Sequence, residues 1–347
     1  MQRVKKFIEN VGWPRILIAL FLLSLFVIAP FVGVRLDASI NDTLVRFGMN
    51  GVLVLAMVPM VQSGCGLNFG LPLGIIAGLL GAVTSVELEV TGLAGVLTAM
   101  LIATPIAVFL GWCYGLLLNK VKGSEMMIAT YVGFSSVAFM CIMWLALPYS
   151  SPNMVWGYAG RGLRTTISVE AFWQNAISRF ASFRINEFLA VPTGMFIVFL
   201  LLCGAMSLFM RTRTGTAMTI VGSNPEYARA SGVNIDKMRT LSVILSTWLG
   251  AIGIIMYEQS FGFIQLYMGP FYMAFPAVAA ILIGGASVKK AGIVNVIVGT
   301  ILFQGILTMT PSVINSMIQT DMSEVIRIIV SNGMILYALT RATKGRS

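Results

Sequence analysis

Histidine is absent from this chain of 347 residues, and charged side chains make up only 10% of it. The missing imidazole excludes histidine-based metal sites, histidine general bases and histidine-dependent catalytic triads. The four cysteines stand singly inside apolar runs, so we interpret them as packing residues rather than disulfides or metal ligands. Soluble domains carry about 25% charged residues, so a chain that is 57% hydrophobic and this poor in charge is not one of them.

Two catalytic signatures are also missing. The sequence has no GxxxxGK[ST] loop, so it cannot hydrolyse ATP at a P-loop of its own, and it has no GxSxG motif. An intramembrane protease or lipid-modifying transferase is therefore disfavoured. No buried acid pair is predicted for proton or sodium coupling, which also counts against a secondary transporter or channel. We expect no catalytic residue, no metal site and no cofactor in this chain.

Long apolar runs take the place of these features. They are about 17–25 residues long, the length that a helix needs to cross a bilayer, and they predict an all-α, polytopic transmembrane helix bundle in one domain over residues 1–347. The first run is too long for a signal peptide, so we expect it to be retained. About ten spans are predicted, at residues 16–34, 49–64, 71–87, 94–118, 125–147, 187–210, 240–257, 272–287, 291–310 and 325–341.

The remaining charges are distributed asymmetrically over this pattern. With the N-terminus in the cytoplasm, the inner segments hold 16 of the 23 basic residues but only four of the 13 acidic ones. Basic residues favour the cytoplasmic side of membrane proteins. The net charge of +10 therefore indicates that both termini are cytoplasmic, and nucleic-acid binding is not needed to explain it.

Two polar stretches interrupt the apolar runs. Residues 148–186 form the predicted extracytoplasmic loop, in which a semi-amphipathic piece over residues 168–183 is expected to lie on the outer surface. Residues 211–239 form the largest predicted cytoplasmic segment. Because neither stretch is set off by a linker or a block of charge, we expect a single membrane domain.

The cytoplasmic segment contains the signals of a short helix. Ser223 or Asn224 can cap it, Pro225 fits its first position, and Glu226 lies in the first turn, where the helix dipole favours an acid. Gly232 is placed as a left-handed terminator. These residues predict a helix of about two turns, too short to be stable alone, which would suit docking in a partner's groove; an ordinary connector is the alternative. Its exposed side is expected to consist of small residues, namely Ala228, Ala230 and Ser231.

The segment from Gly222 to Asn234, GSNPEYARASGVN, resembles the cytoplasmic coupling-helix motif of ABC importer permeases of the ribose/galactose, nucleoside and branched-chain amino acid group. Tyr227 stands where members usually carry a small residue. The resemblance implies that the helix contacts a separate cytoplasmic ATPase and passes nucleotide-driven movement to the spans. The implied contact residues are Ser223, Asn224, Pro225, Glu226, Tyr227, Ala228, Arg229 and Gly232.

Three further segments extend the resemblance. Residues 63–70, SGCGLNFG, are similar to a glycine-rich segment after the second hydrophobic run, and residues 283–287, IGGAS, are similar to a Gly-Gly-x-Ser turn. Residues 123–130 look more like the nucleoside branch. The resemblance implies the permease subunit of an ATP-binding-cassette importer in the bacterial plasma (inner) membrane. Its solute would be small, neutral and polar, of the monosaccharide type or, as the alternative, a nucleoside or related vitamin.

The resemblance also implies partners. These are a cytoplasmic ABC ATPase that binds the ATP and Mg, an extracytoplasmic solute-binding protein, and a second permease chain that is either identical or related. The permease would perform no covalent chemistry. Membrane lipid would surround it.

The glycines and the proline of residues 63–72 predict a broken membrane helix, because such a stretch cannot continue a regular helix cheaply. Transporter sites often lie at such breaks. A tight helix crossing at glycine and plain interhelical hydrogen bonds are the alternatives, and Asn332 is interpreted in the same two ways. The candidate solute-path residues, which offer amide, hydroxyl and aromatic groups to a neutral polar ligand, are Gln62, Ser63, Asn68, Phe69, Asn295 and Gln304.

The last candidate functional residues lie near the predicted outer ends of the spans. Glu258 and Gln259 end a span, and Glu258 is either functional or exposed to water or paired with an arginine. Asp321, Glu324 and Arg327 are expected to form an outer ion-pair cluster or to contact the delivery protein.

Overall fold

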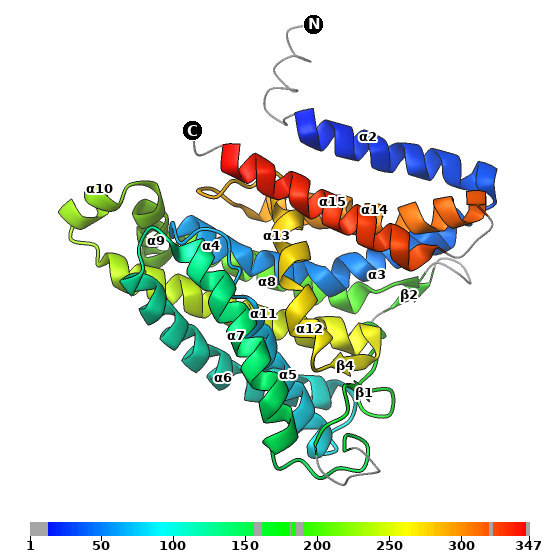
Figure 1. Cartoon of the computed structure of the whole chain (residues 1–347), viewed down its shortest axis with the longest axis horizontal. Coiled ribbons are helices and arrows are strands. Elements are labelled where there is room, and N and C mark those ends of the chain that lie inside the picture. The colour runs from blue at the N-terminus through cyan, green and yellow to red at the C-terminus, as the bar shows by residue number, and fades with distance from the viewer. Residues whose placement is uncertain (1–12, 156–161, 181, 185–189, 319–321, 345–347) are drawn as a thin grey trace, which may run out of the picture.

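The computed structural model describes residues 13–155, 162–180, 182–184, 190–318 and 322–344 (Figure 1). Its helical elements are α2 (Trp13–Ile28), the 3-10 helix η1 (Ala29–Val32), α3 (Leu36–Leu55), α4 (Met57–Gln62), α5 (Pro72–Glu87), α6 (Gly92–Lys120), α7 (Glu125–Ala146), α8 (Thr193–Arg211), α9 (Arg213–Ser223), α10 (Pro225–Ala230), α11 (Ile235–Phe261), α12 (Met268–Tyr272), α13 (Ala274–Ile283), α14 (Ile293–Ile318) and α15 (Ser323–Lys344). Its short strands form two antiparallel pairs, β1 (Thr166–Ser168) with β4 (Phe263–Gln265) and β2 (Phe183–Arg184) with β3 (Ala190–Val191).

The helices confirm an all-α, polytopic membrane bundle. In the described part of the chain, seven helices are long and apolar enough to cross a membrane, and two shorter apolar helices accompany them, α5 and the α12–α13 pair. Helix α15 adds a further helical segment of 22 residues. Each of the ten predicted spans coincides with one of these helical segments.

The second span is longer than the sequence predicts. We expected it at residues 49–64, but helix α3 begins at Leu36 and is continued by α4 to Gln62. The first turns of α3 carry polar side chains, so a hydropathy pattern does not detect them as part of a span. These polar residues are compatible with a helix, since Asp37 in the first turn meets the positive end of the helix dipole.

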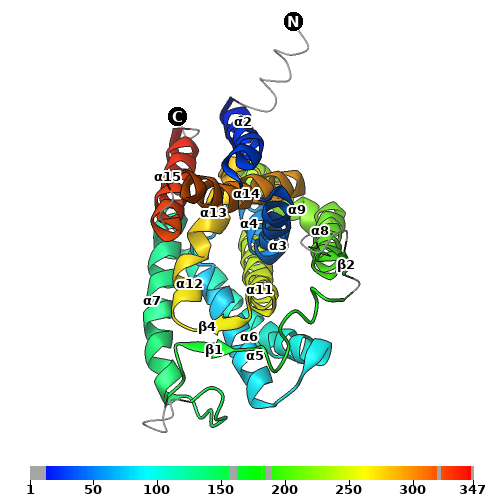
Figure 2. The ribbon, with the colours of Figure 1, turned by 90° about the vertical axis from the view of Figure 1, so that its right-hand side faces the viewer.

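Helix α11 forms the centre of the bundle and packs against α3, α4, α5, α6 and α9 (Figure 2). Glycine allows α5 to approach it closely. A Cβ atom added at Gly74 or Gly78 of α5 would lie under 3.0 Å from the carbonyl oxygen of Thr247 or Ala251 of α11. Small residues spaced four apart are the usual means by which membrane helices bring their backbones together.

Helices α13 and α14 cross in the same way. A Cβ atom at Gly284 would overlap the carbonyl oxygen of Asn295, and one at Gly299 would overlap that of Ala280. The two glycines therefore fix how closely and in which register the two helices pack.

The segment over residues 168–183 is partly buried. Its described residues form mostly turns, with the side chains of Trp173 and Ile177 buried, and its position on the outer surface stays a prediction. The amide of Gly92, at the start of α6, donates a 2.7 Å hydrogen bond to the carbonyl of Phe172. Trp173 and Ile177 therefore pack against neighbouring elements, whereas the side chains of Phe180 and Phe183 are exposed.

The segments predicted to be cytoplasmic lie together at one end of the bundle, toward the upper left of Figure 1. They include the start of α2, the α6–α7 turn, α9 and α10, and the loop after α13. Contacts join them: Arg15 donates to the carbonyl of Gly285 at 2.8 Å, and Lys122 pairs with Asp236 at 2.6 Å. We call this the α10 end of the bundle.

The glycine crossing of α13 and α14 gives a stability prediction. Gly299→Val should lower the apparent melting temperature in detergent, because overpacking a close contact costs about 1–3 kcal/mol. Thermal unfolding followed by circular dichroism measures the shift. Gly204→Val on α8 is the matched control, since a Cβ atom there meets nothing within 4 Å; equal shifts for both variants would contradict the crossing.

Candidate functional site

A helix break separates α4 from α5, as the sequence predicts. Helix α4 ends at Gln62 and α5 begins with Pro72 in its first turn. Between them, Gly64 and Gly66 have φ angles of 77° and 81°, a left-handed conformation that only glycine adopts readily. The break is mostly buried, so neighbouring protein must satisfy its polar groups.

Side chains of α6 and α11 supply these partners. The Oγ atoms of Ser63 and Ser242 lie 2.6 Å apart, and the Asn68 side-chain amide donates to the Oγ of Ser246 at 2.7 Å. The hydroxyl of Tyr114 donates to Asn68 Oδ1 at 3.3 Å. Asn68 and Ser63 thus make interhelical hydrogen bonds in this conformation, and their contact with a solute stays a prediction.

A second break follows α13. It covers residues 284–292, and Gly285 within it has a φ angle of 86°. The side chain of Asn295 fastens this loop, because its Nδ2 donates to the carbonyl of Gly284 at 2.8 Å and its Oδ1 accepts from the amide of Gly292 at 2.9 Å. The Gln62 side chain donates to the carbonyl of Ala291 and so joins the two breaks.

The two breaks adjoin the two short apolar helices of the bundle. Helix α5 follows the first break, and the α12–α13 pair precedes the second. Short, glycine-interrupted hydrophobic segments are a pointer to the binding sites of transporters. The structure therefore brings Gln62, Ser63, Asn68 and Asn295 into one region, at the α10 end of the bundle.

An aromatic cluster lies beside the first break. The ring of Phe69 is 5.7 Å from that of Phe275, and Phe134 of α7 lies 5.2 Å from Phe271 and 6.1 Å from Phe275, measured between centroids. Of these four rings, the sequence predicts only Phe69 as a candidate. Phenylalanine is common in apolar runs, so no sequence signal distinguishes the other three rings.

Gln304 lies apart from this region. It is buried in α14, about 14 Å along the helix axis from Asn295 at 1.5 Å per residue. Asn332 is exposed on α15.

The remaining candidates lie near the predicted outer ends of the spans. Glu258 is buried rather than exposed to water. The side-chain amide of Gln259 donates to Ser178 Oγ at 3.0 Å and accepts from the amide of Ile177 at 3.3 Å, so it holds the 168–180 turns against α11. Glu324 and Arg327 form an exposed ion pair at 2.9 Å on α15, while Asp321 lies outside the described residues.

The short helix of the coupling segment forms as predicted. Helix α10 begins with Pro225 after the cap residue Asn224, whose Oδ1 accepts from the amide of Tyr227 at 2.9 Å. Gly232 follows with a φ angle of 76°. Asn224, not Ser223, is therefore the cap.

The exposed side of α10 agrees with the prediction only in part. Ala228 is fully buried, and the side chain of Tyr227 is 61% exposed. Glu226 and Arg229 are exposed beside it. We expected a surface of small residues. Ala230 and Ser231 are exposed as expected, but helical phase turns Ala228 inward, and Tyr227 lies on the outside beside the two charges.

Helix α9 was not predicted, and it packs against α10, which we expected to be too short to be stable alone. Helix α9 also packs against α4, α8 and α11. Its last turn meets the first helix break: a Cβ atom at Gly222 would lie under 3.0 Å from the carbonyl oxygen of Gln62 and from the amide nitrogen of Gly64. The coupling segment is therefore in direct backbone contact with the break.

Ion pairs attach α11 to the α6–α7 turn near this contact. Arg239 and Glu125 lie 2.6 Å apart with both side chains largely buried, and Lys122 pairs with Asp236. The side-chain amide of Asn119 donates to the Oγ1 of Thr240 at 2.9 Å. The start of α11 is thus held between α10 and the ends of α6 and α7.

Known permeases resemble the chain in sequence. The xylose transport system permease protein XylH of Escherichia coli K12 is 28% identical over 204 residues, which cover 55% of this chain and 50% of that protein. The ribose import permease protein RbsC of the same organism is 29% identical over 133 residues, 38% of this chain and 41% of that protein. The tyrosine transport system permease protein of Clostridioides difficile R20291 is 23% identical over 191 residues, 54% of this chain and 64% of that protein.

The chain spans about half the length of the first of these curated relatives. No solved structure gives a significant match. A family model described as the permease component of branched-chain amino acid transport systems matches residues 39–338. Its members are permease subunits of ABC transporters, which are transport components rather than enzymes. The match covers most of the chain, which therefore belongs to this permease family.

Proposed function

We propose that this chain is the membrane-spanning permease subunit of an ATP-binding-cassette importer for a small neutral polar solute of the monosaccharide type. An extracytoplasmic binding protein delivers the solute, and a separate cytoplasmic ATPase drives its translocation. Family membership and the similarity to xylose and ribose permeases support this proposal. The bacterial origin of these relatives supports a bacterial inner membrane as the location.

The observation that carries the proposal is the contact between an exposed helix and a helix break. Helix α10 presents Tyr227 and two flanking charges to solvent, and exposed tyrosine and arginine side chains are typical anchors of protein interfaces. One turn before it, Gly222 touches the first break. An ATPase that moves α10 would therefore displace the break through a short, stiff connection.

We assign the α10 end to the cytoplasm. The exposed basic side chains at this end include Lys120, Arg211, Arg213, Lys289 and Lys290, and basic residues favour the cytoplasmic side. The ATPase would supply the ATP and Mg sites that this sequence lacks. A second permease chain, identical or related, would complete the path between two such subunits.

The region between the breaks is proposed to contact the solute. Asn68, Ser63 and Gln62 carry the amide and hydroxyl groups that pair with sugar hydroxyls, and Phe69 with its neighbouring rings offers apolar faces to a sugar ring. These amides bond to protein in the present conformation. In our proposal, movement of the break exchanges those bonds for bonds to solute and alternates access to the path.

The docking role of α10 predicts the effect of charge reversal. Glu226→Arg should lower transport-coupled ATPase activity of the reconstituted complex by about tenfold or more, because it reverses a charge beside Tyr227, the proposed anchor of the interface. Gly232→Pro should do the same, since proline cannot adopt a φ angle of 76°. Glu170→Arg, an exposed reversal at the opposite end, is the matched control, and unchanged coupling in both α10 variants would contradict the docking site.

The backbone contact of Gly222 predicts a separation of docking from coupling. Gly222→Ala should leave co-purification of the ATPase unchanged and reduce solute uptake by about tenfold, because even a methyl group overlaps the carbonyl of Gln62. Uptake into vesicles that contain the complete complex measures it. Gly204→Ala, where nothing lies within 4 Å, should keep full uptake; normal uptake with Gly222→Ala would show that the contact transmits nothing.

The solute class is tested with a panel of ligands. Ribose and xylose should bind the cognate binding protein and stimulate ATP-dependent uptake, while uridine and tyrosine should do so at least about tenfold more weakly. Isothermal titration with the binding protein and uptake with the complex measure both. A preference for uridine would establish the nucleoside alternative, and uptake driven by an ion gradient without an ATPase would contradict the importer itself.

A further inference from the structure

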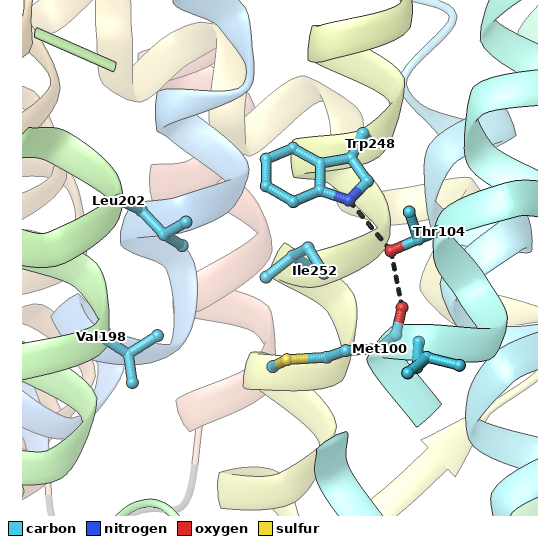
Figure 3. A pocket seen from close by; sticks show the side chains of 7 residues that line it. Met100, Thr104, Val198, Leu202, Trp248 and Ile252 are labelled. Carbon is cyan, nitrogen blue, oxygen red and sulfur yellow. Dashed lines mark hydrogen bonds between the residues drawn. The ribbon is translucent and has the colours of Figure 1, made fainter. Parts of the chain in front are cut away.

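A pocket of about 420 Å³ lies on the side of the bundle, away from the proposed solute path. Val198 and Leu202 of α8 face Trp248 and Ile252 of α11 and Met100 of α6 across it (Figure 3). The pocket thus separates α8 from α6, and none of the candidate solute-path residues lines it.

The polar groups of the pocket already have partners. The indole nitrogen of Trp248 donates to Thr104 Oγ1 at 3.1 Å, and Thr104 donates to the carbonyl of Met100 at 2.8 Å (Figure 3). Leu101 at the rim is 74% exposed, so the pocket opens sideways. A ligand that fills this space gains contact with apolar side chains and needs no hydrogen bond, which fits a hydrocarbon chain.

The depth of the pocket fits the middle of a bilayer. At 1.5 Å per residue, Leu202 lies about 14 Å along α8 from Arg211. Trp248 lies about 17 Å along α11 from Lys237. Half of a hydrocarbon core is about 15 Å, so the pocket lies where acyl chains end if these basic residues mark the membrane surface.

Basic side chains lie at the same end of all three helices that line the pocket. Lys120 ends α6, Arg211 ends α8, Arg213 begins α9, and Lys237 lies in the first turn of α11; all four are exposed. Basic clusters beside membrane helices attract anionic lipid headgroups, by about 1 kcal/mol for each residue. These four basic side chains are complementary in charge to a lipid phosphate.

We propose that the pocket between α6, α8 and α11 is a binding site for one anionic phospholipid. One acyl chain fills the apolar pocket, and the headgroup lies among Lys120, Arg211, Arg213 and Lys237. The lipid supplies the packing between α8 and α6 that side chains leave open. The site uses none of the candidate solute-path residues.

Quenching of Trp248 fluorescence tests the proposal on the full chain in vesicles. The protein is reconstituted in phosphatidylcholine with increasing fractions of phosphatidylglycerol brominated at mid-chain, and in a second series the bromine is on phosphatidylcholine instead. The Trp248 signal is the difference between the native protein and Trp248→Phe. Half-maximal quenching should need less brominated phosphatidylglycerol than brominated phosphatidylcholine. The expected difference is about fivefold for each basic residue that the headgroup engages.

Two pairs of variants make the result specific. Arg211→Gln with Arg213→Gln should reduce the preference for anionic lipid by about fivefold or more, whereas Lys289→Gln with Lys290→Gln, at the same end but on another loop, should not. Leu202→Phe should fill the pocket and reduce quenching at least about twofold; Leu201→Phe, on the exposed side of α8, should not.

Two outcomes would overturn the proposal. Equal quenching by both brominated lipids would mean that Trp248 faces bulk lipid without a specific site. Absence of quenching in every lipid would mean that protein, such as a helix of a second copy, covers the pocket.

Discussion

Close approach of one backbone to another at glycine is the constraint on which the rest of this structure depends. Spans in a bilayer gain little from hydrophobic burial against one another, so packing and hydrogen bonds must hold them. Gly74 lies against α11, Gly299 against α13, and Gly222 against the first break, each where a side chain would overlap a backbone atom. These contacts set the positions of α5 and α14, and they bring the coupling segment into direct backbone contact with the first break.

The helix breaks depend on a second constraint, since a membrane offers no water to satisfy exposed amides and carbonyls. Asn295 hydrogen-bonds the backbone at both ends of the loop after α13, and Gln62 links this loop to the first break. Asn68 connects that break to α6 and α11. The side chains that stabilise the breaks are therefore the same ones that we propose to contact a neutral solute, and in that proposal a single residue holds the path closed and later binds the solute.

The sequence predicts those parts of the molecule that arise from local physics. Apolar runs located ten helical segments, and the capping residues of α10 located its start and its end, because hydropathy and helix caps act within a few residues. It did not predict α9, the inward direction of Ala228 or the rings around Phe69. Each of these is decided by tertiary packing: α9 is stabilised by four neighbouring helices, and Phe134 meets Phe275 only when α7 and α13 come together.

The hydrogen bonds of the first break bear on how transport would be controlled. Leaving a buried hydrogen-bonding group without a partner costs about 1–3 kcal/mol, and a new partner that takes the place of the old one avoids this cost. Asn68 can therefore leave Ser246 at low cost only when a solute hydroxyl takes its place. Opening of the path without solute is disfavoured for this reason, and in our proposal the remaining work of opening falls to the contact between Gly222 and Gly64, through which the ATPase would act. Coupling between solute and nucleotide would then follow from hydrogen-bond satisfaction at one helix break.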